Sequence, residues 1–100
     1  MRMEKILNLN FAIATAIKQA REEAGLTQTQ LAGFSGLSEI YISALERGQK
    51  GDSINALFLI ARALKVDAAS LVFAIETTLK HHTAAPVVRR GRPQKRIKPT

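Results

Sequence analysis

The sequence predicts an all-α protein: a compact five-helix bundle followed by a flexible basic C-terminal arm. Apolar residues recur at helical spacing in five segments, and no segment alternates convincingly enough to be a strand. With 100 residues, 46% of them hydrophobic, the chain is long enough for one domain with its own core. No run of apolar residues is long enough to span a bilayer.

The first two helices are bounded by clear local signals. The first is expected over about residues 10–24, and Gly25 follows it as a residue that takes the left-handed conformation at low cost. The second begins after Thr27, where Gln30 lies three positions later and completes a capping box for exposed backbone N–H groups. This helix is expected to stop near residues 35–36, at another glycine.

The other three helices are expected to begin after Ser38, Ser53 and Asp67, which are favourable N-cap residues. The third is broken by the stretch RGQKG at residues 47–51, and the last is expected to end near residue 80. Short connections between short helices are typical of a compact bundle. The positions expected to face the core in the first four helices are Ile13, Ile17, Ala20, Ala24, Leu31, Ala32, Ile42, Leu45, Leu57, Ile60, Ala61 and Leu64.

The net charge of +7 is placed almost entirely at the C-terminal end. Six of the fifteen Lys and Arg residues, and none of the eight Asp and Glu residues, lie in residues 81–100. A near-neutral body with a basic tail indicates a polyanionic partner, most simply nucleic acid. The tail holds all three prolines and no aromatic residue, so residues 81–100 are expected to be flexible, leaving residues 1–80 as the domain, with its core at about 10–80.

Several classes of function find no support. The chain has no cysteine and no recognisable signal peptide, which favours a cytoplasmic location and excludes disulfides and thiolate metal sites. His81 and His82 lack a third ligand nearby, so neither a metal site nor a cofactor is expected. There is no glycine-rich phosphate loop and no Ser/His/Asp or paired-carboxylate arrangement, so the protein is not expected to be an enzyme.

Residues 28–47 are the most informative stretch of the chain. Two short helices joined by a tight turn containing glycine predict a DNA-binding helix-turn-helix. Ala32 is small where the two helices cross, and Gly36 lies in the turn, where a positive φ is expected. The residues expected to hold the pair against the rest of the domain are Leu31, Leu37, Ile42 and Leu45.

These residues resemble the phage-repressor/Cro-type helix-turn-helix family, also called the xenobiotic-response-element type. The resemblance covers roughly residues 13–75 and includes GLTQ, LA, GLS, YIS, LERG and IARALKV in the family's order. It implies a lambda-repressor-like fold, double-stranded DNA as the partner, and a role in transcription regulation. The pattern YIS-x-x-ERG and the compact length are also similar to the controller proteins of restriction–modification systems.

The resemblance also implies roles for individual residues. A recognition helix of about residues 38–46 enters the major groove with its N-terminal part. Gln28 corresponds to a residue that anchors a phosphate at the start of the second helix. Arg21 and Glu46 correspond to a structural ion pair between the first helix and the end of the recognition helix. The other expected DNA contacts in this part of the chain are Thr29, Ser38, Glu39, Ile40, Tyr41, Ser43, Ala44, Arg47 and Lys50.

The expected recognition helix is poor in side chains that make paired hydrogen bonds to one base. Glu39 and Ala44 lie where many relatives carry Gln, Arg or Asn. Glu39 accepts from the cytosine amino group but not from guanine's acceptors, and Ile40 contacts a thymine methyl. Glu39 has the alternative role of a solvated residue that favours the helix N-terminus. Tyr41 is expected to be exposed toward DNA, because other residues already define the inner face.

The apolar stripe of the last helix has two interpretations. It either closes the core or also supports a homodimer. The first four helices already supply a core, and Phe73 falls off the stripe, so a twofold dimer that reads two half-sites about one helical turn apart is favoured. The residues expected at this interface are Leu71, Val72, Phe73, Ile75 and Leu79.

The arm contains the sequence RGRP at residues 90–93, which is similar to the core of an AT-hook. Gly91 allows close approach to the floor of a narrow minor groove, flanking arginines follow its negative potential, and Pro93 disfavours a helix. A nonspecific phosphate-binding arm and simple solubilisation are the alternatives. The arm residues expected to contact DNA are Arg89, Arg90, Arg92, Lys95 and Arg96.

Two other functions remain open at the level of the sequence. The protein could be an antitoxin whose apolar surface covers a toxin while it also binds DNA. It could also be an architectural nucleoid protein with weak sequence preference, which the poor base-reading set allows. Contact with RNA polymerase is compatible with the regulator.

Overall fold

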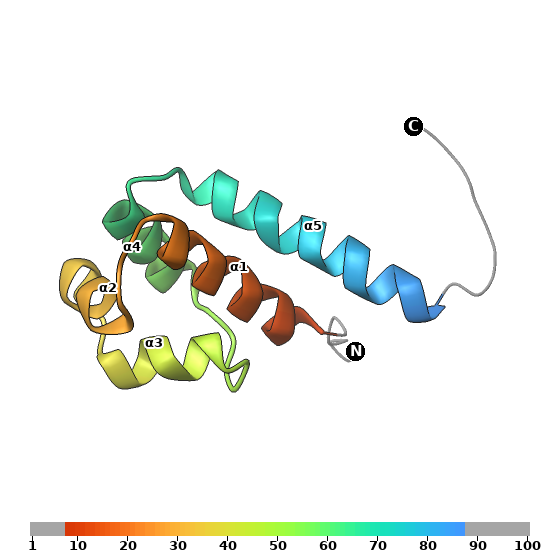
Figure 1. The fold of residues 1–100 in the computed structure, drawn as a ribbon, viewed down its shortest axis with the longest axis horizontal. Helices are drawn as coiled ribbons and strands as arrows, with labels where there is room; N and C mark the ends of the chain where they lie inside the picture. The colour runs from red at the N-terminus through yellow and green to blue at the C-terminus, as the bar shows by residue number, and fades with distance from the viewer. Residues whose placement is uncertain (1–7, 88–100) are drawn as a thin grey trace, which may run out of the picture.

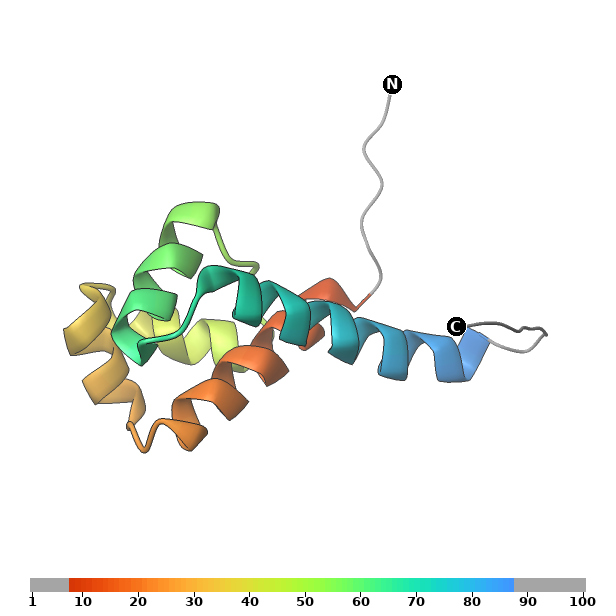
Figure 2. The same cartoon turned by 90° about the horizontal axis from the view of Figure 1, so that it is seen from above.

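The computed structural model describes residues 8–87, and within that range the chain forms α-helices and no strand. The helices are α1 (Leu9–Glu23), α2 (Gln28–Ser35), α3 (Glu39–Glu46), α4 (Ile54–Leu64) and α5 (Ala68–Val87). The first four helices form a compact globule, and α5 runs alongside α1 and projects beyond it (Figures 1 and 2). The predicted all-α, five-helix fold is therefore confirmed.

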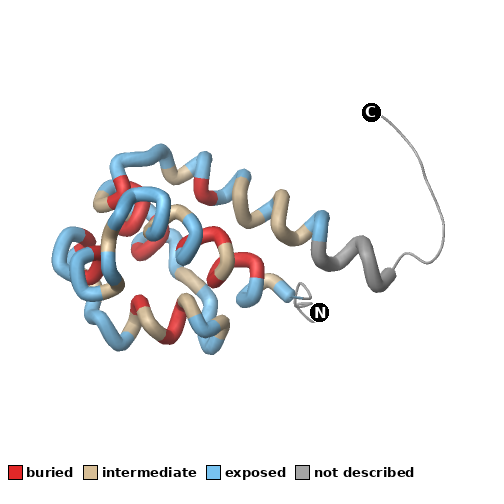
Figure 3. The backbone as a smooth tube through the Cα atoms, in the orientation of Figure 1, coloured by how far each residue is buried: buried red, intermediate tan, exposed pale blue. Residues whose placement is uncertain are grey.

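The hydrophobic core lies where α1 to α4 meet the beginning of α5 (Figure 3). Each fully buried aliphatic side chain contributes about 1.5–3 kcal/mol to folding relative to its exposure in water. Of the predicted core positions, Ala20 is only partly buried and Ala24 is exposed at the C-terminal end of α1, while the others are buried. The largest fully buried side chains are Ile17, Leu31, Ile42, Leu45 and Ile60.

The predicted N-caps of α2, α3 and α4 are all present. The side chains of Thr27, Ser38 and Ser53 each accept a hydrogen bond from the backbone N–H three residues later, at 3.0 Å. The Thr27 N–H in turn donates to Gln30 Oε1 at 2.9 Å, which completes the capping box. Such caps contribute about 1 kcal/mol each, and they begin the helices where the sequence predicts.

The turn between α2 and α3 depends on glycine. Gly36 has φ +80°, in the left-handed region that disfavours a side chain, and its N–H donates to the Ala32 carbonyl at 2.9 Å. A Cβ at Gly36 meets no atom outside its own chain neighbours, so the strain of a substitution there comes from the backbone alone. Ala32 is 7% exposed in the contact between α2 and the core.

The last helix is longer than predicted. The flexible arm was expected to begin at residue 81, but α5 continues to Val87. The predicted boundary rests on the composition of residues 81–100 as a whole, with three prolines and no aromatic residue. Residues 81–85 themselves contain neither glycine nor proline to break a helical backbone. Between residues 68 and 81 of α5, Leu71 is buried against the globule, and Ile75 and Leu79 are half-buried.

Candidate nucleic-acid interface

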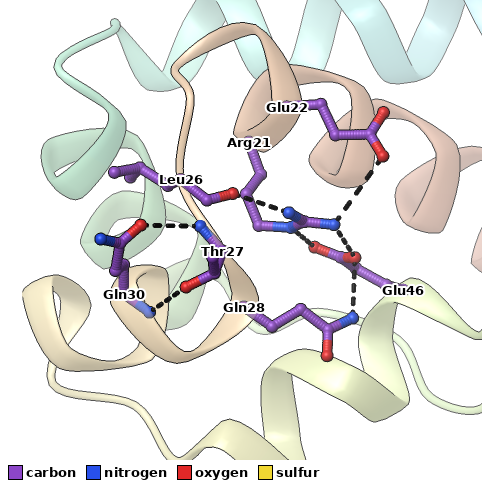
Figure 4. A network of polar contacts seen from close by, with 7 residues as sticks. All are labelled: Arg21, Glu22, Leu26, Thr27, Gln28, Gln30 and Glu46. Atoms are coloured by element: carbon purple, nitrogen blue, oxygen red, sulfur yellow. Dashed lines mark hydrogen bonds and ion pairs between the residues drawn. The ribbon is translucent and has the colours of Figure 1, made fainter.

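The first three helices are joined by a polar network centred on Glu46, at the C-terminal end of α3 (Figure 4). Arg21 Nε donates to Glu46 Oε2 at 2.7 Å, and Arg21 Nη2 donates to Oε1 at 3.0 Å. Arg21 Nη1 also donates to the carbonyl of Leu26 at 2.7 Å, which ties in the segment before α2. The predicted structural ion pair is therefore confirmed, in a bidentate form.

This network is buried and charged. The side chains of Arg21 and Glu46 are only 11% and 2% exposed. The hydrogen bond to Glu46 raises the pKa of Arg21 further above its ordinary value, so the guanidinium stays protonated. A buried pair of this kind fixes the orientation of α3 relative to α1, because moving either helix leaves a charge without its partner.

Gln28, the expected phosphate anchor, takes part in the same network. Its Nε2 donates to Glu46 Oε1 at 3.0 Å, from the first residue of α2. The amide therefore links the start of α2 to the end of α3 in this structure. Gln28 remains half-buried at the N-terminus of a helix, where backbone N–H groups favour an anion.

A second bridge joins the two helices near the start of α3. Thr29 Oγ1 donates to Glu39 Oε2 at 2.8 Å, and both residues are exposed. Both were predicted as DNA contacts, and the fold brings them together across the turn. The starts of α2 and α3 therefore form one continuous polar surface.

The outer face of α3 is formed by residues predicted to read DNA. Ile40 is 83% exposed, whereas the next turn carries the half-buried Ser43. Arg47 follows the helix and donates through Nη1 to Ser43 Oγ and through Nη2 to Gln49 Oε1, the latter at 3.1 Å. These contacts hold the Arg47 side chain against the C-terminal turn of α3, where its charge is near the exposed face.

One predicted DNA contact, Ala44, is largely buried. Ala44 is 9% exposed and belongs to the inner side of α3, with Ile42 and Leu45. Residue 44 follows Ile40 by one helical turn. Its side chain is nevertheless covered, so little of its methyl group is available to a base edge.

Tyr41 is less exposed than predicted. The residue is half-buried and packs against the core, and its hydroxyl donates to Asp52 Oδ1 at 3.0 Å. Lys50 Nζ lies 5.0 Å from the centre of the Tyr41 ring. Burial raises the pKa of Tyr41, and the hydrogen bond to Asp52 adds to the effect, so the phenol keeps its proton at neutral pH.

Asp52 and Lys18 are functional candidates that the sequence reasoning missed. Asp52 precedes the cap of α4, and no local pattern indicates its contact with α3. Lys18 on α1 lines a hollow of about 390 Å³ together with Arg47 and Gly48, which joins two cations from distant parts of the chain. Only the tertiary contact between α1 and the end of α3 places these two charges at one hollow.

The expected dimer surface is partly corrected. Leu71 is 2% exposed and belongs to the core, so it is not available to a partner. Val72 and Phe73 are 43% and 70% exposed, while Ile75 and Leu79 are half-buried.

The apolar surface extends from α5 onto α4. Ile54 and Phe58 are 71% and 58% exposed, and they line one hollow with Val72 and Phe73. Neither α4 residue is predicted from the sequence, although an apolar pair four positions apart and off the core stripe is a signal for an exposed apolar face. We call Ile54, Phe58, Val72 and Phe73 the α4–α5 face.

Three further expectations concern the C-terminal arm, membrane spans and metal binding. The arm residues Arg89, Arg90, Arg92, Lys95 and Arg96 lie outside the described residues. Between residues 8 and 87, no helix has the length and apolarity needed to cross a membrane. The same part of the chain holds no group of three or more His, Cys, Asp or Glu side chains that could bind a metal ion.

Comparison with known proteins agrees with this geometry. Residues 17–71 match the model of the helix-turn-helix family HTH_3. An uncharacterised HTH-type transcriptional regulator, y4dJ of Sinorhizobium fredii, is 37% identical over 78 residues, which are 78% of this chain and 94% of that protein.

Solved structures of a restriction–modification controller protein, C.Esp1396I, are also similar. That of a point mutant covers 80% of this chain and 99% of its own, with 31% identity and a TM-score of 0.70. The crystal structure of the C.Esp1396I tetramer in complex with its natural 35 base-pair operator covers 76% of this chain and 97% of its own, with 32% identity and a TM-score of 0.66.

Proposed function

Because the chain belongs to the Cro/CI-type helix-turn-helix family and is a DNA-binding transcription regulator, we propose that it reads operator DNA with α3 in the major groove. The observation that carries the proposal is the continuous surface made by the starts of α2 and α3. Two interhelical hydrogen bonds, Thr29 to Glu39 and Gln28 to Glu46, hold these helices in one rigid unit. A rigid unit enters the groove without a further cost of ordering.

The contacts with bases come from the N-terminal half of α3. Ile40 is the most exposed large apolar residue in the described part of the chain and is suited to a thymine methyl group. Glu39 accepts hydrogen bonds from cytosine or adenine amino groups, and Ser43 serves either as donor or as acceptor. With its carboxylate held by Thr29, Glu39 is positioned to reject phosphates and the acceptors of guanine.

The contacts with phosphates surround this surface. The N-terminus of α2, at Gln28 and Thr29, offers backbone N–H groups and the positive end of the helix dipole. Arg47, Lys50 and Lys18 supply positive charge from the other side of α3. Such contacts set the register of the protein on the duplex and supply most of its salt-dependent affinity.

We further propose a homodimer formed through the α4–α5 face. Exposed apolar residues on two neighbouring helices are costly for a monomer in water and are suited to a self-complementary twofold interface. The tetramer of C.Esp1396I on its operator supports assembly of this kind. A twofold dimer presents two copies of α3 to two half-sites about one helical turn apart.

The arm, residues 88–100 with its RGRP sequence, is proposed to add affinity by contacting the minor groove or phosphates beside each half-site. The rival functions receive less support. The matching family is one of DNA-binding regulators rather than enzymes, and its named members do not favour an antitoxin.

Selection of bound sequences from random DNA tests the proposal, followed by affinity titrations at several salt concentrations. We expect the full chain to enrich two symmetric half-sites, and Ile40→Ala to lose the preference for thymine at one position in each. Arg47→Ala should weaken binding to all sequences and reduce the slope of log affinity against log salt by about 1, because one phosphate contact is lost.

Arg62→Ala is the matched control, since Arg62 is an exposed cation on α4 and is not one of the residues proposed to contact DNA. It should change neither affinity nor slope. Removal of residues 88–100 measures the contribution of the arm in the same assay. A ratio of specific to nonspecific affinity near one contradicts the proposal and selects the architectural function.

A further inference from the structure

The contact between Tyr41 and Asp52 has a chemical consequence for recognition. Tyr41 is the third residue of α3, in the half of the helix that faces the groove in the proposed complex. Its hydroxyl donates to Asp52 Oδ1 at 3.0 Å, so its single hydrogen is already used within the protein. The Tyr41 ring also makes a cation–π contact, with Lys50 Nζ 5.0 Å from the ring centre.

One of the two carboxylate oxygens of Asp52 lacks a hydrogen-bond partner in the described part of the chain. This oxygen, Oδ2, is buried. Burial raises the pKa of Asp52 above its ordinary value, whereas the hydrogen bonds from the Tyr41 hydroxyl and the Ser53 backbone act in the opposite direction. A buried acceptor without a partner costs stability, so stability alone does not account for a carboxylate at this position.

The polarity of the contact determines what Tyr41 can offer to DNA. A phenol oxygen whose hydrogen is donated to a carboxylate retains only its lone pairs for other partners. It accepts hydrogen bonds from the amino groups of adenine and cytosine. It cannot donate to guanine O6 or N7, to thymine O4 or to a phosphate oxygen.

We propose that Asp52 is a positioning residue for sequence recognition, which makes Tyr41 a hydrogen-bond acceptor and directs it toward adenine or cytosine amino groups. This inference rests on the proposed function, since it requires α3 to lie in the major groove. Asp52 acts through Tyr41 and does not itself contact DNA. It comes from the segment before α4, so a residue outside the helix-turn-helix shapes the preference of the recognition helix.

Selection from random DNA with four proteins tests this inference: the unmodified chain, Asp52→Ala, Tyr41→Phe and the double variant. We expect the unmodified chain to prefer adenine or cytosine at one position that Tyr41→Phe reads without preference. Asp52→Ala frees the Tyr41 hydrogen, so the preference at that position should move toward guanine or thymine by about twofold to tenfold. The double variant should match Tyr41→Phe alone, because Asp52 has no effect without the hydroxyl.

Asp67→Ala, which removes an exposed carboxylate before α5, is the matched control and should keep the original preference. If Asp52→Ala does not fold, base analogues test the same polarity with the unmodified chain. Purine in place of adenine, or 2-pyrimidinone in place of cytosine, removes the amino group and should weaken binding by about twofold to tenfold. The same analogues should not affect Tyr41→Phe.

The inference is overturned if Asp52→Ala keeps the original preference, if Tyr41→Phe keeps it, or if the amino group can be removed without loss. Each of these results leaves the proposed function intact, because sequence selection by the unmodified chain persists. Failure of the unmodified chain to select any sequence is the different result that contradicts the proposed function itself.

Discussion

Glu46 is the residue on which the arrangement of the first three helices depends most directly. It accepts from Arg21 on α1 and from Gln28 on α2 while belonging to α3. Its side chain is 2% exposed, so its charge has almost no contact with water. A carboxylate in that position is favourable only while its cationic partner is present.

Replacement of Arg21 tests this dependence. Arg21→Met should lower the free energy of unfolding by about 3–5 kcal/mol, because it leaves the buried Glu46 charge without its cation. Glu22→Gln is the control: Glu22 is 59% exposed and lies 4.0 Å from the same guanidinium, so its loss should cost less than about 1 kcal/mol. Urea denaturation of both variants measures the difference, and equal small losses contradict a structural role for the pair.

At the scale of single elements, the unit of α2, turn and α3 combines local and tertiary determinants. Its helix starts are set by Thr27 and Ser38, whose caps are local to the chain. The angle between the helices is set by Gly36, in the left-handed conformation, and by the small Ala32. Because the caps, the turn glycine and the small alanine are all close together in the sequence, the motif was predictable from their spacing.

Gly36 and Gly33 should respond in opposite ways to replacement by alanine. Gly36→Ala should destabilise the protein by about 1–2 kcal/mol, since alanine is strained at φ +80°. Gly33 lies inside α2, has no positive φ, and a Cβ there meets no atom within 4 Å. Gly33→Ala should therefore stabilise the protein by about 0.5–1 kcal/mol. Thermal unfolding of both variants measures the two signs, and destabilisation of similar size in both variants contradicts this account of the turn.

At the scale of the whole molecule, the two surfaces have different characters and lie on different helices. The polar surface is made by the starts of α2 and α3, and the apolar α4–α5 face is made by Ile54, Phe58, Val72 and Phe73. A regulator that presents two recognition helices needs one surface for DNA and another for its second copy. A separate surface for the second copy explains why a protein with a net charge of +7 also exposes an apolar patch.

The dimer is tested by placing a charge on the α4–α5 face. At concentrations on the order of tens of micromolar, the full chain should sediment as a dimer and Phe73→Glu as a monomer, because burial of an unpaired carboxylate opposes association. Phe34→Glu is the matched control, since Phe34 is 67% exposed on α2, outside this face. It should remain dimeric. A monomeric full chain under these conditions excludes the interface.

Features that depend on neighbours within one helical turn could be predicted from the sequence alone. These include the helix starts at Thr27, Ser38 and Ser53, the core stripes, and the presence of a helix-turn-helix. The Arg21–Glu46 pair was predictable only through the family resemblance, because its members are 25 positions apart. Caps and periodicity are energetic preferences of short segments, so they are readable without the fold.

The side-chain contacts across the turn and the loops depend on tertiary packing. It brought Thr29 to Glu39 and Tyr41 to Asp52, buried Ala44, and joined α4 to α5 in one apolar face. Each of these depends on the rotation and crossing of packed helices, which follow from how the whole core closes rather than from any local pattern. The sequence therefore predicts where the proposed recognition surface lies, and the fold sets its hydrogen-bonding character.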